Sequence, residues 1–336
     1  MDPEPHPLTD THVDPGLTAP ADVPADAPGP TMLPLRELPA PPGPRLPAAD
    51  WPWWTAPAAL IVGLLLAAVG GLAVDIPVAV LFGVNVTSSS LPGGLEIADT
   101  VVQDAMFVVA AVLFAKVGGR AVRAWQFGLQ RPGIGWLSPR RGWWWAAAMI
   151  LVTLFTFLVF SVAWAEILNV SSKEKLLEQL GANEGTSLLL LSAGLTCVVA
   201  PICEEFLFRG FVFRALCNWR GVWPAAAITG LLFGGIHAGS APAVDLMPLA
   251  ALGFGLCLLY RYTGSLYPCI AAHSLNNSLA FGALEGWGWQ IPVLAACALA
   301  TIALLAVTLR HAGVITAPPA PAPPAVAPNG YVTPTA

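Results

Sequence analysis

The chain has 336 residues, of which 56% are hydrophobic and only 10% are charged. Soluble domains carry about 25% charged residues, so this composition excludes an ordinary soluble protein and predicts a chain whose solvent is largely lipid. The net charge of −5 combines tails, loops and two membrane faces. No basic patch with interleaved aromatic residues is present, which argues against a nucleic-acid partner.

Both ends of the chain have a composition that does not favour burial. Residues 1–50 are rich in Pro, Asp and Ala, and they lack the basic segment and apolar core of a signal peptide. We expect a disordered cytoplasmic tail there, and a second disordered Pro/Ala-rich tail over residues 314–336. Residues 51–313 are expected to form the transmembrane helical domain, with a candidate functional core at about 187–285.

Membrane spans of about 20 mostly apolar residues can be placed eight times between the tails. The fifth segment is short and the fourth runs directly into two glutamates, so six or seven spans are possible if one segment is re-entrant. The sequence predicts an all-α polytopic bundle of about eight spans. The segments are 56–81, 100–118, 143–165, 187–203, 224–238, 246–262, 266–282 and 290–309.

The distribution of positive charge predicts an orientation. With the N-terminus inside, all but two of the 15 Lys and Arg residues fall on the cytoplasmic side, and Lys173 and Lys175 fall outside. This assignment places Arg209 and Arg214 in a cytoplasmic segment after the fourth span. It predicts an integral protein of the cell membrane with both termini in the cytoplasm.

Two adjacent glutamates, Glu204 and Glu205, follow the fourth span. Ionisable groups at membrane depth are costly and are therefore functional candidates. On a helix, Glu205 and Arg209 share a face and can pair, whereas Glu204 is rotated by about 100° and points elsewhere. One carboxylate can then be structural while the other is free to act as a general base. The alternative is ordinary surface charge at the cytoplasmic interface.

Two further polar positions lie in later spans. His237 follows the glycine pair at 234–235, which would let another helix or a substrate backbone approach closely. A lone histidine in an apolar helix is often simply a satisfied polar group. His273 and Asn277 are four residues apart and stack on one face, with Asn276 beside them, so they could line a site or join two helices. Together with the glutamates, they predict one shared water-accessible cavity.

These three segments, in this order, resemble the motifs of one family, the CPBP intramembrane proteases, also called the CAAX protease and bacteriocin-processing or Abi family. The family pattern is Glu-Glu-x-x-x-Arg, then Phe-x-x-x-His, then His-x-x-x-Asn, each on its own helix. Here the three motifs are Glu204–Arg209, Phe233–His237 and His273–Asn277. The resemblance covers about residues 190–285, roughly a third of the chain.

The resemblance implies a role for each motif residue. Glu204 would activate a water molecule with help from His237, and that water would attack a substrate carbonyl. His273 and Asn277 would stabilise the resulting oxyanion, as donors directed at developing charge do. The supporting residues would hold the motif helix and shape the cavity; they are Glu205, Arg209 and Phe233.

The resemblance leaves the cofactor open. Some members are described as metalloproteases and others as metal-free glutamate proteases. Glu204, His237 and His273 form a set that could hold Zn²⁺ with one position open for water. We favour a metal-independent site, with zinc as the alternative.

The activity implied is that of an intramembrane endopeptidase acting on a membrane-associated or prenylated peptide or protein within the lipid bilayer. Eukaryotic relatives cleave prenylated CAAX proteins, and prokaryotic relatives are linked to bacteriocin self-immunity or peptide maturation. Because the fourth span ends at Cys203, the peptide bond is expected near the cytoplasmic side.

Two alternatives to the peptidase function stay open. One is a proton-coupled transporter that uses Glu204, His237 and His273 as a relay, although no internal repeat is evident. The other is a non-catalytic scaffold of the immunity type.

Overall fold

The computed structural model describes residue 46 and residues 49–85, 92–133, 139–168 and 185–318, all within one unit that spans residues 41–336. Helices are the only extended regular elements of these residues, and no strand occurs among them, which confirms the predicted all-α membrane bundle. The two expected tails fall almost entirely outside the described residues, and so do Lys173 and Lys175. The predictions made for them therefore stay predictions.

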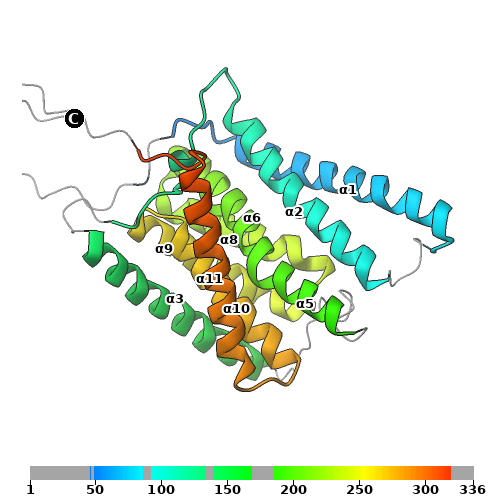
Figure 1. The fold of residues 1–336 in the computed structure, drawn as a ribbon. Helices are drawn as coiled ribbons and strands as arrows, with labels where there is room; N and C mark the ends of the chain where they lie inside the picture. The colour runs from blue at the N-terminus through cyan, green and yellow to red at the C-terminus, as the bar shows by residue number, and fades with distance from the viewer. Residues whose placement is uncertain (1–45, 47–48, 86–91, 134–138, 169–184, 319–336) are drawn as a thin grey trace, which may run out of the picture. The chain divides into compact units, whose positions relative to one another are not determined.

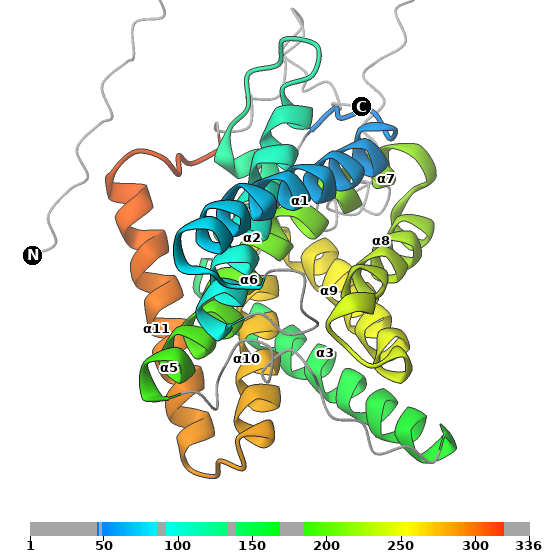
Figure 2. The same cartoon turned by 90° about the vertical axis from the view of Figure 1, so that its right-hand side faces the viewer.

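Two long helices, α1 (Thr55–Phe82) and α2 (Gly93–Ala115), pack side by side in both views of the fold (Figures 1 and 2). Large apolar side chains stay exposed along α1, among them Ile61, Leu65 and Val69 at 58%, 61% and 65% exposure. A continuous exposed apolar run of this kind is unfavourable in water. Lipid is therefore the solvent that this face fits.

Helix α3 (Pro139–Leu168) packs against α9 (Leu246–Thr263), and a tryptophan joins the two helices near each end. The indole of Trp145 donates a hydrogen bond of 3.1 Å to the Tyr262 carbonyl. The indole of Trp164 donates one of 2.9 Å to the Val244 carbonyl, directly before α9. Since the two bonds pair opposite ends of the helices, α3 and α9 run antiparallel.

The helix that carries the two glutamates runs without interruption from Thr186 to Arg220 over 35 residues, and we call it the motif helix. The prediction that the fourth span ends at residue 203 is therefore wrong. Glu205 and Arg209 pair with each other inside the protein, as described below, and the helix continues past them. Five segments compose it: α5 (Thr186–Gly194), π-helical η4 (Leu195–Val199), α6 (Ala200–Glu205), π-helical η5 (Phe206–Val212) and α7 (Phe213–Arg220).

This continuous helix changes the charge count used for orientation. Arg209 and Arg214 were assigned to a cytoplasmic segment after the fourth span, but both lie within the motif helix at 0% and 4% exposure. They are not loop charges, and the prediction of their place is wrong. The orientation argument then depends on the remaining Lys and Arg residues.

Helix α8 (Val222–Ile236) approaches α9 closely because glycines lie between them. A Cβ atom added at Gly230 would lie 2.6 Å from the Ala250 carbonyl oxygen, and one at Gly234 would overlap the Leu246 carbonyl oxygen. Gly235 faces open space instead. The predicted close approach of a second helix is confirmed for Gly234, whereas Gly235 makes no such contact.

The chain continues with α10 (Tyr267–Leu284) and α11 (Gln290–His311). Seven helices of the described residues are long and apolar enough to cross a membrane, and α10 is not among them. Its sequence includes His273, Asn276 and Asn277, which lower its apolar content. Each of the eight predicted spans corresponds to a helix, and the most polar of these helices carries the third motif.

Short turns bring several helix ends together at one end of the bundle. Gly221 joins α7 to α8, and residues 264–266 join α9 to α10. The segment after α2 lies against the second of these turns, because the Leu266 amide donates to the Gly128 carbonyl at 2.8 Å. We call this end the arginine end, since its turns and helix termini carry Arg120, Arg123, Arg131, Arg220, Arg261 and Arg310.

Candidate active site

Glu205 is the centre of a buried polar cluster, which we call the Glu205 network. Arg209 Nη1 donates to Glu205 Oε1 at 2.7 Å, so the ion pair expected from the four-residue spacing is present. His273 Nδ1 lies 2.8 Å from the same oxygen, and Arg209 Nη2 donates to the Gly253 carbonyl at 3.1 Å. All three side chains are buried, at 4% exposure or less. The network therefore ties the motif helix to both α9 and α10.

Phe233 on α8 completes this arrangement from one side. The Arg209 guanidinium lies over its ring, 4.4 Å from the centroid, in the geometry of a cation–π contact. The ring also contacts His237 and His273, with centroid distances of 5.0 and 5.6 Å. Phe233 thus contacts the guanidinium of the network and both histidine rings at once.

Glu204 is directed away from this network and lines a cavity of about 360 Å³. The side chain is buried, and its Oε2 atom has no hydrogen-bond partner in the structure. The nearest cationic or imidazole group is His273 Nε2, at 4.0 Å. The ring of His273 therefore stands between the two glutamates, with Nδ1 bonded to Glu205 and Nε2 on the side of Glu204.

His237 lines the same cavity from the C-cap of α8, so it ends the helix and does not lie inside it. Its Nδ1 atom lies 2.8 Å from the Phe233 carbonyl oxygen. Because a carbonyl can only accept, this bond requires the proton on Nδ1, and Nε2 of the neutral ring is then an acceptor. The cavity thus holds a carboxylate and a basic imidazole nitrogen, which together can take a proton from water.

Helix α10 is fastened to the first π-helical segment of the motif helix. Asn277 Nδ2 donates to the Thr196 carbonyl at 2.9 Å, and Ser274 Oγ donates to the Cys197 carbonyl at 2.6 Å. π-helical turns are frequent at functional sites. An amide carries two hydrogens, so Asn277 keeps a second one for a ligand in the cavity that it lines.

Helix α2 supplies a wall of this cavity that no sequence motif indicated. Its lining residues are Glu96, Thr100, Gln103 and Asp104. Asp104 is 1% exposed, and its Oδ2 atom has no hydrogen-bond partner. The available signal was the cost of a carboxylate within a predicted span, because Asp104 falls inside the predicted segment 100–118.

The cavity lies toward the end of the bundle opposite the arginine end. Its lining comes from the first half of α2, the end of α8 with His237 to Ser240, the first turn of α9 and the second half of α10. Glu204 itself lies near the middle of the 35-residue motif helix. The prediction that Glu204 lies at the cytoplasmic end of its span is therefore wrong, because that span continues for sixteen residues from Glu204 to Arg220.

The predicted zinc ligands do not form a metal-binding group in this arrangement. Within the described ranges, no three His, Cys, Asp or Glu side chains are placed to hold a metal ion together. His273 uses Nδ1 for Glu205 and His237 uses Nδ1 for a backbone carbonyl. We therefore derive no chemical step through a metal, and the choice between a metal-free and a zinc site stays a prediction.

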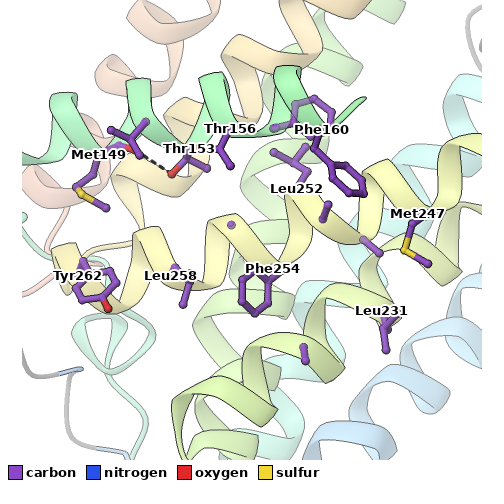
Figure 3. Close-up of a pocket in the computed structure, with 16 residues that line it drawn as sticks. Met149, Thr153, Thr156, Phe160, Leu231, Met247, Leu252, Phe254, Leu258 and Tyr262 are labelled. Atoms are coloured by element: carbon purple, nitrogen blue, oxygen red, sulfur yellow. Dashed lines mark hydrogen bonds between the residues drawn. The ribbon is translucent and has the colours of Figure 1, made fainter. Parts of the chain in front are cut away.

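An apolar pocket of about 540 Å³ lies beside the polar cavity, between α3, α8 and α9. Figure 3 shows Met149, Thr153 and Phe160 extending from α3 on the side of α9, and Phe254 and Leu258 extending from the side of α9 that is turned away from α3. Leu252 lines both this pocket and the polar cavity. The polar cavity that Glu204 and His237 line is thus adjacent to an apolar pocket.

Comparison with known proteins agrees with this site. Residues 186–279 match the family described as "Type II CAAX prenyl endopeptidase Rce1-like". The chain is 33% identical over 81 residues to the Bacillus subtilis (strain 168) protein named "Putative membrane peptidase YdiL", over 24% of this chain and 32% of that protein. The chain thus matches about a third of the length of this curated relative. No solved structure matches the chain.

The matched residues include every member of the three motifs, from Glu204 to Asn277. The same residues build the Glu205 network and much of the cavity wall. Residues 186–279 of the chain are therefore similar to the Rce1-like CAAX prenyl endopeptidase family.

Proposed function

We propose that the protein is an intramembrane endopeptidase that hydrolyses a peptide bond of a membrane-associated or lipidated peptide. The observation that carries this proposal is the different treatment of two adjacent carboxylates. Glu205 is bonded on one oxygen by Arg209 and His273, whereas Glu204 faces a cavity with an unpartnered oxygen. His237 lines that cavity with a free basic nitrogen.

The residues support a hydrolysis that needs no other reactant than water. A water molecule bonded to Glu204 and His237 gives up a proton as its oxygen forms a bond to the carbonyl carbon. Asn277 donates to the resulting oxyanion through its amide. His273 can donate to it only as an imidazolium, because the proton on Nδ1 is engaged by Glu205. The abstracted proton then passes to the amide nitrogen, the C–N bond breaks, and an acid and an amine are formed. The network behind Glu204 keeps the motif helix in place during these steps.

The apolar pocket supports a lipidated substrate. It is lined almost entirely by hydrocarbon and aromatic side chains, and it meets the polar cavity at Leu252 (Figure 3). A lipid chain buried there would hold the attached peptide next to Glu204, and each buried CH₂ would contribute about 0.8 kcal/mol. Holding the reacting groups together in this way lowers the entropic part of the barrier.

We place the protein in the cell membrane with the arginine end in the cytoplasm, as the positive-inside rule favours. Both described ends of the helical domain belong to that end. Asn218, near the end of α7, donates to the carbonyls of Ala49 and Trp51 at 2.9 Å, and α11 ends with Arg310 and His311. The cavity then opens toward the outer half of the membrane.

The test is cleavage of a lipidated peptide library by the purified full-length protein in detergent. Glu204→Ala and His237→Ala should each abolish cleavage seen with the wild type, while Glu166→Ala, an exposed glutamate on α3, should keep it. Equal behaviour of the wild type and both cavity variants would refute the proposal. Loss of activity with a chelator and recovery with zinc would support the metal alternative. Proton-coupled uptake into liposomes that requires Glu204 would support a carrier.

A further inference from the structure

The polar wall that α2 presents to the cavity is not used by the hydrolysis described above. Its residues at 96, 100, 103 and 104 follow the spacing of one helix face. With a rise of 1.5 Å per residue, the face extends for about 12 Å. Its two carboxylates lie at the ends, with Glu96 near the start of α2 and Asp104 deep in the bundle. A substrate that enters from the end opposite the arginines would meet this face.

Asp104 is the residue of this wall whose buried carboxylate has an oxygen without a hydrogen-bond partner. It is 1% exposed, lines the cavity, and keeps an unpartnered oxygen. It also lies within electrostatic range of Glu204. Burying a carboxylate without a partner is costly, and a second carboxylate nearby increases that cost. A positively charged group in the cavity would relieve both.

The protein does not provide that group from its own side chains in the part of the chain that is described. No lysine or arginine lines the cavity there. The Arg209 guanidinium of the neighbouring network is engaged by Glu205 and the Gly253 carbonyl. A ligand with a positive charge would therefore complement Asp104.

Asp104 differs in its surroundings from the other aspartate of α2. The same helix has a second aspartate, Asp99, whose side chain is directed at α1, where it shares a hydrogen bond with Asp75 and faces Gly71. Asp99 does not line the cavity. The acidic residues of α2 are thus divided between a helix contact and the cavity.

We propose that Asp104 is a substrate-binding residue that receives a lysine or arginine side chain close to the scissile bond, so that the enzyme selects cationic peptides. The methylene stem of such a side chain can lie along apolar lining residues such as Leu195, Leu249 and Leu252 while its charge reaches Asp104. Glu204 then stays available to activate water. This inference rests on the proposed function, which supplies the scissile bond. It adds that the substrate carries a positive charge that Asp104 binds.

The first test uses three lipidated peptides that differ at one position near the cleaved bond, with lysine, norleucine or glutamate there. For the wild type, kcat/KM should be about tenfold or more higher for lysine than for norleucine, which corresponds to about 1.4 kcal/mol, and lowest for glutamate. Asp104→Asn should bring the lysine-to-norleucine ratio close to one, and Asp104→Glu should keep it well above one. Asp99→Asn is the matched control and should leave the ratio at its wild-type value.

The second test measures binding of the same peptides to Glu204→Gln protein in nanodiscs, with and without Asp104→Asn, so that no cleavage is needed. Tighter binding of the lysine peptide than of the norleucine peptide would support the inference if Asp104→Asn removes that difference. This result would support it even if no peptide is cleaved, and then only the proposed function would fail. Equal binding of lysine and norleucine peptides by Glu204→Gln protein would overturn it. The inference would also be overturned if Asp99→Asn lowered the lysine-to-norleucine ratio as much as Asp104→Asn does.

Discussion

Two polar regions meet at adjacent residues of one helix, and they differ in whether a carboxylate is paired with a cation. In the Glu205 network, Glu205 Oε1 accepts from Arg209 at 2.7 Å and lies 2.8 Å from His273 Nδ1, although Glu205 Oε2 and Arg209 Nε have no hydrogen-bond partner. In the cavity next to it, Glu204 and Asp104 each keep an unpartnered oxygen, and no lysine or arginine of the described residues lines that cavity. A rotation of about 100° between neighbouring residues separates the two regions.

The difference shows that buried charged side chains of a membrane protein can either stabilise the packing of its helices or act on a ligand. Within a bilayer, buried polar groups must find partners inside the protein, because no lipid tail can bond them. The network contains a buried ion pair and contributes to holding three helices together. The described residues provide no such cation in the cavity, and carboxylates left without one at membrane depth are those expected to act on a ligand. Substitutions in the two regions should therefore affect different measurements.

Breaking the network should have the largest effect on stability. Arg209→Ala leaves Glu205 and His273 buried without their cation, and removing one partner of a buried pair typically costs about 3–5 kcal/mol. The free energy of unfolding, measured by denaturant titration in mixed micelles, should fall by that amount. Arg220→Ala, at an exposed arginine that stacks on Trp219, is the control and should change it by less than about 1 kcal/mol. Similar unfolding of the two variants would contradict a structural role for the network.

Asn277 offers a test on the cavity side. If its second amide hydrogen reaches the oxyanion, Asn277→Ala should lower kcat by about 10² to 10³ with a smaller change in KM. Ser278→Ala, in the next position of α10, removes a buried hydroxyl that bonds its own helix at the Ser274 carbonyl, and kcat should be retained. If Asn277→Ala leaves kcat unchanged but lowers the stability of the protein, Asn277 only joins α10 to the motif helix. Its spacing from His273 also allows this alternative.

The glycine pair of α8 gives the smallest effect and a matched control. A methyl group at Gly234 would overlap the backbone of α9, so Gly234→Ala should lower the free energy of unfolding by about 1–3 kcal/mol. Gly235→Ala adds a methyl group in open space and should be neutral or slightly stabilising. Thermal unfolding followed by circular dichroism can compare them. Equal losses at the two positions would contradict the contact between Gly234 and α9 as the cause.

The sequence was sufficient to predict the fold where local composition determines it. The segments 56–81 and 290–309 correspond to α1 and α11 within a few residues, because apolar runs bounded by polar residues set helix limits in lipid. The end of the motif helix could not be predicted in this way. Glu205 and Arg209 pair with each other and are also bonded by His273 and the Gly253 carbonyl, which are 68 and 44 residues away from their partners in the chain.

The site was predictable to the extent that it depends on spacing along one helix. The pair Glu205 and Arg209 follows from a separation of four residues, and it is present. His273 was grouped with the residues available to the substrate, yet one of its nitrogens belongs to the Glu205 network. The position of Asp104 beside Glu204 depends on how α2 packs against the motif helix. Neither feature is encoded in a local pattern, and both require the tertiary arrangement.

The most direct measurement compares Glu204→Gln with Glu205→Gln for peptide cleavage and for unfolding in the same detergent. We expect Glu204→Gln to lower the cleavage rate by about 10² to 10⁴, as loss of a general base does, while its unfolding transition stays close to that of the wild type. Glu205→Gln should lower the unfolding transition clearly, because it weakens the bonds to Arg209 and His273. Cleavage retained by Glu204→Gln, or the same loss of stability in both variants, would contradict the division between a catalytic and a structural carboxylate.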